Sequence, residues 1–334
     1  MRLSLSFGGY YAPARNYVDA AVQCEKAGLD SIWMTDVQTI DRDVYERLAL
    51  CAVKTSKIRL GPAITNPLTR HPTITAAAIM TLDEISGGRA NLGLGPGDGS
   101  VRRIGLKPAT KAQLEAEIDV LRNLFAGNSA DLGKGNTTSI RWKAGDIPIY
   151  MPATGPKMLE LAGRVADGVI INVGTNANSV AHALERVRLG RARSTRRKFT
   201  TGAFCYFSIA ENREEAINAA RPYVVWFLRN ATHLFGLSGL TKFKEQVDAA
   251  QGDYMRTDFI HAETWAESVE KASFVTDEAV RNFAIAGTPE DVVKQLKEKE
   301  KMGIDLFIAR HTGEEDEWKR FLATYCESVV PSFA

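Results

Sequence analysis

The sequence predicts an α/β protein with the (β/α)8 TIM-barrel architecture, formed by a single domain of residues 1–334 with a helical insertion at about 230–274. Apolar segments with strand character alternate about eight times with segments of helical spacing. Such alternation favours parallel pairing, because each helix carries the chain back across the sheet. Glycine and proline also concentrate after the strands, where barrels of this kind collect their catalytic groups.

The first half of the chain supplies four strand–helix units. The segment Leu3 to Phe7 alternates with polar residues, and Gly28 closes the helix that follows it. Strands are expected at 3–7, 30–34, 58–63 and 90–95, and helices at 17–27, 43–55, 73–85 and 111–125. Residues 127–145 are rich in Gly, Asn, Ser and Thr, so we expect an excursion at the rim with a short strand-like piece at 139–142.

The second half continues the alternation. Strands are expected at 147–151, 167–172, 200–209 and 305–309, and helices at 156–165, 178–191, 213–230, 240–251 and 314–329. Thr288 and Pro289 have the order of an N-cap and a first helical residue, so another helix starts there. An open doubly wound sheet is the alternative architecture, but no GxGxxG follows the first strand.

Composition excludes several classes of protein. The chain has 42 basic and 40 acidic residues, a formal net charge of +2, and no basic excess typical of nucleic-acid binding. No apolar run is long enough to cross a bilayer, and the N-terminus does not resemble a secretory signal, so we expect a cytoplasmic protein without a membrane partner. The four cysteines and five histidines show no metal-ligand spacing, and no metal is expected.

The stretch Leu60 to Pro72 is the most distinctive part of the chain. It holds three prolines and one glycine between a strand and a helix, which fixes the backbone and suits a binding loop. His71 either assists proton transfer or simply opens the helix that follows. Asp98 is the acid of a glycine-rich loop and is either a proton donor or acceptor or a turn residue. Asp36 and His311 are expected at the same rim.

Two further loops are candidates for binding a phosphate group. Thr154 and Gly155 precede a helix whose free N–H groups suit an anion, and Gly174 and Thr175 follow the next strand. Ordinary turn chemistry explains both loops equally well. Neither a G-x-S-x-G elbow nor a Walker loop is present. So few titratable groups favour a cofactor that supplies its own chemistry.

Four segments together resemble the bacterial-luciferase-like superfamily, and within it the methylenetetrahydromethanopterin reductase-like proteins. They are Gly61 to Pro72, Asn91 to Asp98, Lys157 to Gly168 and Ala286 to Asp291. The resemblance implies a (β/α)8 barrel that binds FMN or the deazaflavin coenzyme F420 at the carboxyl ends of its strands. It also implies a homodimer.

The resemblance also assigns residues to the cofactor. It implies a non-proline cis peptide bond between Ala63 and Ile64 that supports the isoalloxazine ring, and contacts from Thr65 and Asn66 to that ring. The segment that starts at Gly95, passes through Gly97 and ends at Asp98 would line the ring. Thr154, Gly155, Gly174 and Thr175 would hold the phosphate.

One departure bears on function. Methanopterin reductases carry an acid in the first strand, whereas Leu3 to Phe7 contains none. This departure favours FMN as the cofactor and a monooxygenase that oxidises a small organic molecule. A separate NAD(P)H:flavin reductase would supply the reduced FMN. An F420-dependent reductase or dehydrogenase is the alternative, and a non-catalytic flavin-binding protein is another. A cofactor-free barrel lyase is disfavoured, because no expected strand ends in a lysine.

Overall fold

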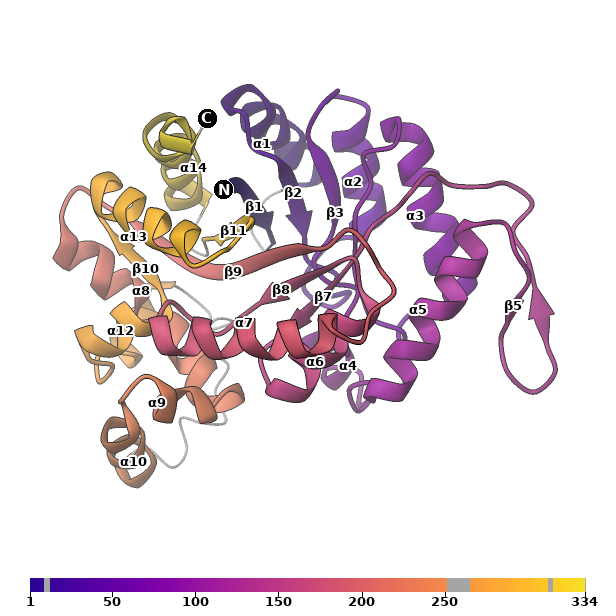
Figure 1. Ribbon diagram of the computed structural model, residues 1–334. Coiled ribbons are helices and arrows are strands. Elements are labelled where there is room, and N and C mark those ends of the chain that lie inside the picture. Colours follow the sequence, from indigo (N-terminus) through magenta and orange to yellow (C-terminus); the bar gives the residue numbers. More distant parts are fainter. Residues whose placement is uncertain (9–12, 251–264, 312–314, 334) are drawn as a thin grey trace.

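The computed structural model describes residues 1–8, 13–250, 265–311 and 315–333 (Figure 1). Eight strands form one parallel sheet in the order β3-β2-β1-β11-β9-β8-β7-β4. Their bounds are β1 (Arg2–Phe7), β2 (Ser31–Met34), β3 (Arg59–Pro62), β4 (Leu92–Gly93), β7 (Ile149–Ala153), β8 (Gly168–Ile171), β9 (Thr200–Ile209) and β11 (Leu306–Arg310). Bridges from Leu60 to Ala90 and from Thr65 to Leu94 join the two end strands and close the ring. The predicted barrel is therefore confirmed.

Helices cover the outside of this ring. They are α1 (Ala14–Ala27), α2 (Val44–Ala52), α3 (Pro72–Ser86), α5 (Lys111–Phe125), α6 (Pro156–Val165), α7 (Ala177–Arg191), α8 (Arg213–Asn230), α13 (Pro289–Lys301) and α14 (Glu315–Thr324). Local sequence fixes several of their starts. Asp43 accepts a hydrogen bond from the backbone N–H of Tyr45 at 2.9 Å. Thr288 and Asp291 form a reciprocal capping box before α13, at the predicted start of that helix.

Smaller elements decorate the barrel. A two-stranded hairpin, β5 (Ala130–Asp131) with β6 (Thr137–Thr138), occupies the predicted rim excursion, while residues 139–142 form no strand. β10 (Ile285–Gly287) extends the sheet beside the end of β9. The last α-helix is shorter than predicted, because a short π-helix at Tyr325–Val329 and a 3₁₀-helix at Val330–Phe333 follow α14.

The expected insertion contains short helices. They are α9 (His233–Leu237), α10 (Thr241–Ala250) and α11 (Trp265–Lys271), followed by α12 (Asp277–Phe283), and residues 251–264 lie outside the described part of the chain. In Figure 1, α9 and α10 project from the barrel below α12. None of the described helices combines the length and apolar character that crossing a bilayer requires.

Packed side chains fill the barrel interior. Trp33, Tyr150, Ile170, Leu306 and Ile308 form a buried cluster that is separate from the large core between sheet and helices. The Trp33 and Tyr150 rings meet edge to face with their centroids 5.3 Å apart. A site for a ligand must therefore lie beyond this plug, at the ends of the strands.

Candidate active site at the mouth of the barrel

A cavity of about 730 Å³ lies at the carboxyl ends of the strands. Its wall comes from β1, β9, β11, the loops after β2, β3 and β4, and the end of α8. Residues that line it include Ser6, Thr35, Ala63, Asp98, Phe204, Tyr206, Trp226, Arg229 and Arg310. Segments from both ends of the chain therefore meet at one mouth, as the barrel prediction requires.

The loop after β3 continues its pairing with the segment around β4. The peptide bond between Ala63 and Ile64 is cis, as the family resemblance implies. Thr65 donates its N–H to the Gly93 carbonyl at 2.9 Å and accepts from the Gly95 N–H at 3.0 Å. The Thr65 hydroxyl is buried and has no hydrogen-bond partner within the described residues. A buried hydroxyl of this kind is expected to find a partner when a ligand is present.

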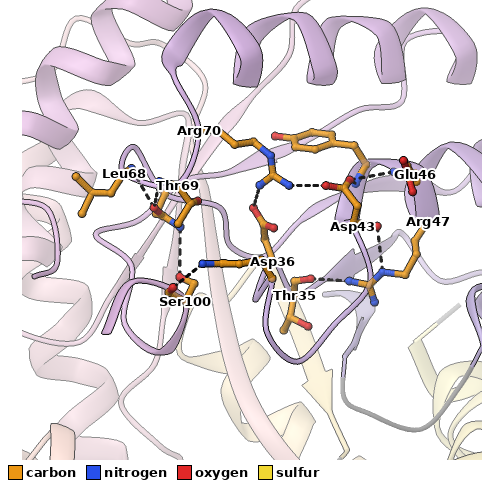
Figure 2. A network of polar contacts seen from close by, with 12 residues as sticks. Thr35, Asp36, Asp43, Glu46, Arg47, Leu68, Thr69, Arg70 and Ser100 are labelled. Atoms are coloured by element: carbon orange, nitrogen blue, oxygen red, sulfur yellow. Dashed lines mark hydrogen bonds and ion pairs between the residues drawn. The ribbon is translucent and has the colours of Figure 1, made fainter. Parts of the chain in front are cut away.

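Asn66 holds the shape of this loop. Its Oδ1 accepts hydrogen bonds from the backbone N–H groups of Leu68 and Thr69, both at 3.0 Å, and its Nδ2 donates to Ser100 Oγ at 3.3 Å. Figure 2 shows Leu68 and Thr69 on one side of this turn and Ser100 below it. Asn66 thus ties the loop after β3 to the segment that follows β4.

The glycines after β4 allow these loops to approach closely. A Cβ atom on Gly95 would lie 2.3 Å from Ile64 Cδ1 and 2.6 Å from Pro152 Cγ. Gly97 has a φ of 78°, a conformation that favours glycine. Backbone from β4 therefore packs directly against the cis-peptide loop and β7.

Asp98 lies at the cavity, whereas His71 does not line it. Asp98 precedes the short helix α4 (Gly99–Arg102), and its half-exposed carboxylate accepts a hydrogen bond from Arg102 Nε at 2.8 Å. His71 is exposed at the N-cap of α3, where Nδ1 accepts from the Thr73 N–H at 3.3 Å. The structure places His71 at the helix entry and gives it no contact with the cavity.

The expected phosphate-binding residues lie at the neighbouring starts of α6 and α7, which pack side by side after the adjacent strands β7 and β8 (Figure 1). Gly155 is the N-cap residue of α6, and a Cβ atom added there would meet no atom within 4 Å. Thr175 is already engaged, since its hydroxyl donates to the Arg281 carbonyl at 2.8 Å and Lys299 Nζ donates to its carbonyl at 2.6 Å. None of these four residues lines the cavity itself.

A partly buried ionic network braces the rim. Arg70 pairs with Asp36 and, at 2.7 Å, with Asp43. Figure 2 shows the Arg70 guanidinium between the two carboxylates. Burial opposes the charge on Asp43, yet hydrogen bonds from Arg70 and from the Tyr45 backbone N–H leave its pKa below the ordinary value. Asp36 is therefore a structural partner of the loop after β3, and it is not among the residues that line the cavity.

His311 also differs from its expected place. Its ring stacks on Phe321 with centroids 4.6 Å apart, and Nδ1 lies 3.1 Å from the Phe207 carbonyl. Burial lowers the pKa of His311 to about 4, so the imidazole is neutral at physiological pH. The residue before it, Arg310, faces the cavity instead, because side chains alternate along a strand.

Most residues of the wall were not expected from the sequence, and three of them lie next to one another. Ser6, Arg310 and Tyr206 are register partners on the adjacent strands β1, β11 and β9. Among the described residues that line the cavity, four are arginines (Arg102, Arg103, Arg229 and Arg310) and one, Asp98, is a carboxylate. The mouth is therefore electropositive.

These residues fit a large anionic redox cofactor. The cavity volume lies within the ~300–1,000 Å³ typical of ligand pockets. The Thr65 hydroxyl and Asn172 Oδ1, both after barrel strands, are buried polar atoms that lack a partner in the described part of the chain. The net positive charge of the described wall complements an anionic ligand. Across the described residues, no cluster of three or more His, Cys, Asp or Glu side chains could hold a metal ion.

Comparison with known proteins places the chain among oxidoreductases. A family model described as luciferase-like monooxygenase matches residues 4–306. A 5,10-methylenetetrahydromethanopterin reductase of Archaeoglobus fulgidus is 34% identical over 91% of this chain and 93% of its own length. The structure of a coenzyme F420-dependent tetrahydromethanopterin reductase from Methanopyrus kandleri superposes with a TM-score of 0.84 and 27% identity, and covers 100% of this chain and 99% of the other. A monooxygenase from Streptomyces bottropensis, at 17% identity and a TM-score of 0.69, covers 100% of both chains and shares the fold.

Proposed function

The chain belongs to the luciferase-like monooxygenase family of oxidoreductases, and from that premise we propose that it uses coenzyme F420 as a reductase or dehydrogenase of a small organic molecule. One observation carries this proposal. The likeness to reductases runs along the whole chain, and the solved relative with a TM-score of 0.84 is named for its dependence on F420. The monooxygenase from Streptomyces bottropensis supports the fold alone.

This proposal replaces the preference for FMN that the sequence suggested. That preference depended on the missing acid in the first strand, and the structure does place the serines of β1, not an acid, toward the barrel interior. The absence of that acid leaves the cofactor open, whereas the names of the similar reductases support F420. A separate flavin reductase has no support from these comparisons.

The chain's own residues would bind the cofactor at two places. Ala63, Ile64, Thr65 and Asn66, with Gly95 and Gly97 facing them, would hold the ring at the cavity. Thr154, Gly155, Gly174 and Thr175 would hold the phosphate at the starts of α6 and α7. The Thr175 hydroxyl already donates to the Arg281 carbonyl. We therefore expect Thr154 and the free backbone N–H groups of α6 to contribute more to phosphate binding than Thr175 does.

Bound F420 would supply the hydride chemistry. The protein would orient the substrate, exclude water and handle the proton. Phe204 and Trp226 provide apolar wall that keeps water from the reacting atoms. Asp98 is the carboxylate of the described wall, so it is the residue we assign to proton transfer, with Arg102 holding its orientation.

The proposal is tested by titrating the purified chain with oxidised F420 and, separately, with FMN, and by following the absorption and fluorescence of each. We expect F420 to bind at least about tenfold more tightly than FMN, a difference of about 1.4 kcal/mol. Tighter binding of FMN would return the function to a flavin enzyme. Binding of neither would remove the cofactor assignment.

A further inference from the structure

We propose that Ser6, Arg310 and Tyr206 form a subsite that binds the carboxylate of the substrate, so that this enzyme acts on an organic acid with an aromatic or other planar apolar body. The inference deepens the proposed function, on which its catalytic meaning rests. It concerns the wall of the cavity formed by β1, β11 and β9, and the three residues are called the arginine row below.

The register of the barrel creates this row. Ser6 is the Cα partner of Arg310 across the β1–β11 pair, and Arg310 is the partner of Tyr206 across the β11–β9 pair. In a parallel sheet, register partners lie side by side and their side chains point to the same face. All three residues line the cavity. The row therefore places an arginine between two hydroxyl-bearing residues on neighbouring strands of the mouth.

Arg310 lacks the anion that a buried guanidinium needs. The residue is only 9% exposed, and among the described residues its side chain makes one hydrogen bond, from an Nη atom to Ser6 Oγ at 3.3 Å. Within the described ranges no carboxylate forms an ion pair with it, and Asp98, which shares the cavity, pairs with Arg102. Burial of an unpaired charge is costly. An anionic ligand would satisfy the planar fork, which matches a carboxylate in a bidentate geometry.

Neighbouring positions keep the guanidinium available. A Cβ atom on Gly8 would lie 2.4 Å from an Arg310 Nη atom, so glycine is what leaves room for it. A carboxylate at position 6 would pair with Arg310 inside the protein, whereas the Ser6 hydroxyl accepts one bond and leaves the positive charge uncompensated. Both small residues favour a ligand over an internal partner.

Aromatic side chains next to the row indicate the rest of the ligand. The Phe204 and Tyr206 rings meet edge to face with their centroids 5.4 Å apart, and the Tyr206 ring stacks on that of Tyr223 with a centroid distance of 4.5 Å. Trp226 completes this side of the cavity. Flat apolar walls beside a single buried cation suit an aromatic carboxylate, because its ring gains apolar contact while its charge meets the guanidinium.

A phosphate or carboxylate of the cofactor could supply the same anion, and the experiment must separate the two sources. The probes are benzoate, its uncharged analogue benzamide, inorganic phosphate and F420 itself. Each is titrated calorimetrically into the wild-type chain, and benzoate and benzamide are also titrated into the chain saturated with F420.

We expect wild-type protein to bind benzoate at least about tenfold more tightly than benzamide. Arg310→Gln should remove that difference and leave F420 affinity within about threefold of wild type. Ser6→Asp should abolish benzoate binding as well, because the new carboxylate occupies the guanidinium, and Arg310→Lys should keep part of it. Arg213→Gln, which removes an exposed arginine that does not line the cavity, is the control and should change benzoate affinity by no more than about threefold. Thermal unfolding of each variant checks that it folds.

Several results would overturn the inference. Equal affinity of the wild type for benzoate and benzamide would do so, as would benzoate binding that survives Arg310→Gln. Loss of F420 or phosphate affinity in Arg310→Gln to the same extent as benzoate affinity would assign the arginine to the cofactor. If the wild type binds benzoate through Arg310 but does not bind F420, the carboxylate subsite stands and the proposed cofactor fails.

Discussion

Ser6 and Arg310 are 304 residues apart in sequence, yet they face each other across neighbouring strands and share a hydrogen bond of 3.3 Å. Closure of the barrel brings the first and last strands together and so produces this contact. It puts a buried positive charge at the mouth, beside the loops that the family resemblance assigns to the cofactor. Cofactor and substrate would thus be held by different strands of one ring.

Asn66→Ala should weaken both the loop and the cofactor site. The substitution leaves the N–H groups of Leu68 and Thr69 without their acceptor, so we expect a loss of about 1–3 kcal/mol in unfolding free energy. F420 affinity should fall by at least about tenfold. Urea unfolding and F420 titration measure the two effects. Asn66→Asp keeps an acceptor oxygen and is the matched control; unchanged F420 affinity in the alanine variant would remove Asn66 from the site.

Gly95→Ala should disturb the floor of the ring site. Its Cβ would clash with Ile64 Cδ1 and Pro152 Cγ, so the cis-peptide loop must shift, at a cost of about 1–3 kcal/mol in unfolding free energy. Gly99→Ala is the matched control, because a Cβ there meets no atom within 4 Å. Thermal unfolding together with F420 titration distinguishes the two variants. Equal behaviour of the two would show that close packing at position 95 is unimportant.

Asp98→Asn should slow turnover while it preserves cofactor binding. The amide still accepts the hydrogen bond from Arg102 but cannot transfer a proton in the same way. We expect turnover at saturating F420 to fall by at least about a hundredfold, with F420 affinity nearly unchanged. Steady-state rates over a range of pH provide the measurement. A fully active variant would reduce Asp98 to a turn residue that precedes α4.

His311 should make the fold sensitive to acid. Its pKa is about 4 in the folded protein against 6.5 for an ordinary histidine, because burial disfavours the charged ring. The folded protein favours the neutral ring. The resulting contribution of His311 to the unfolding free energy is complete above pH 6.5 and is lost as the pH falls from there toward 4. The total is on the order of 3 kcal/mol. Urea unfolding of the wild type and of His311→Gln at several pH values tests this, and parallel pH dependence of the two proteins would contradict it.

Much of the fold followed from the sequence, because alternation of strands and helices is a local pattern. The same is true of the loops at 61–72 and 91–98, whose glycines and prolines mark their positions. Arg310 could not be found in this way. It ends a strand of five buried residues, and only the register with β1 and β9 shows that it faces the cavity.

Other errors have similar causes. Asp36 was expected to face the rim, and the structure pairs it with Arg70 from the next strand's loop, a contact that no local pattern encodes. The last helix was predicted to run to Val329, and its final turn, Tyr325–Val329, is a π-helix instead, a difference that apolar spacing does not reveal. The strand-like residues 139–142 lie beside a hairpin whose turn, with glycines at 133 and 135, forms earlier in the chain.

The position of bound F420 tests the central claim most directly. Hydrogen–deuterium exchange of the backbone, measured with and without saturating F420, reports where the cofactor protects the chain. We expect protection of residues 63–69 and 95–101, together with the start of α6, because these segments would hold the ring and the phosphate. Protection confined to other surfaces, or exchange unchanged by F420, would contradict the account.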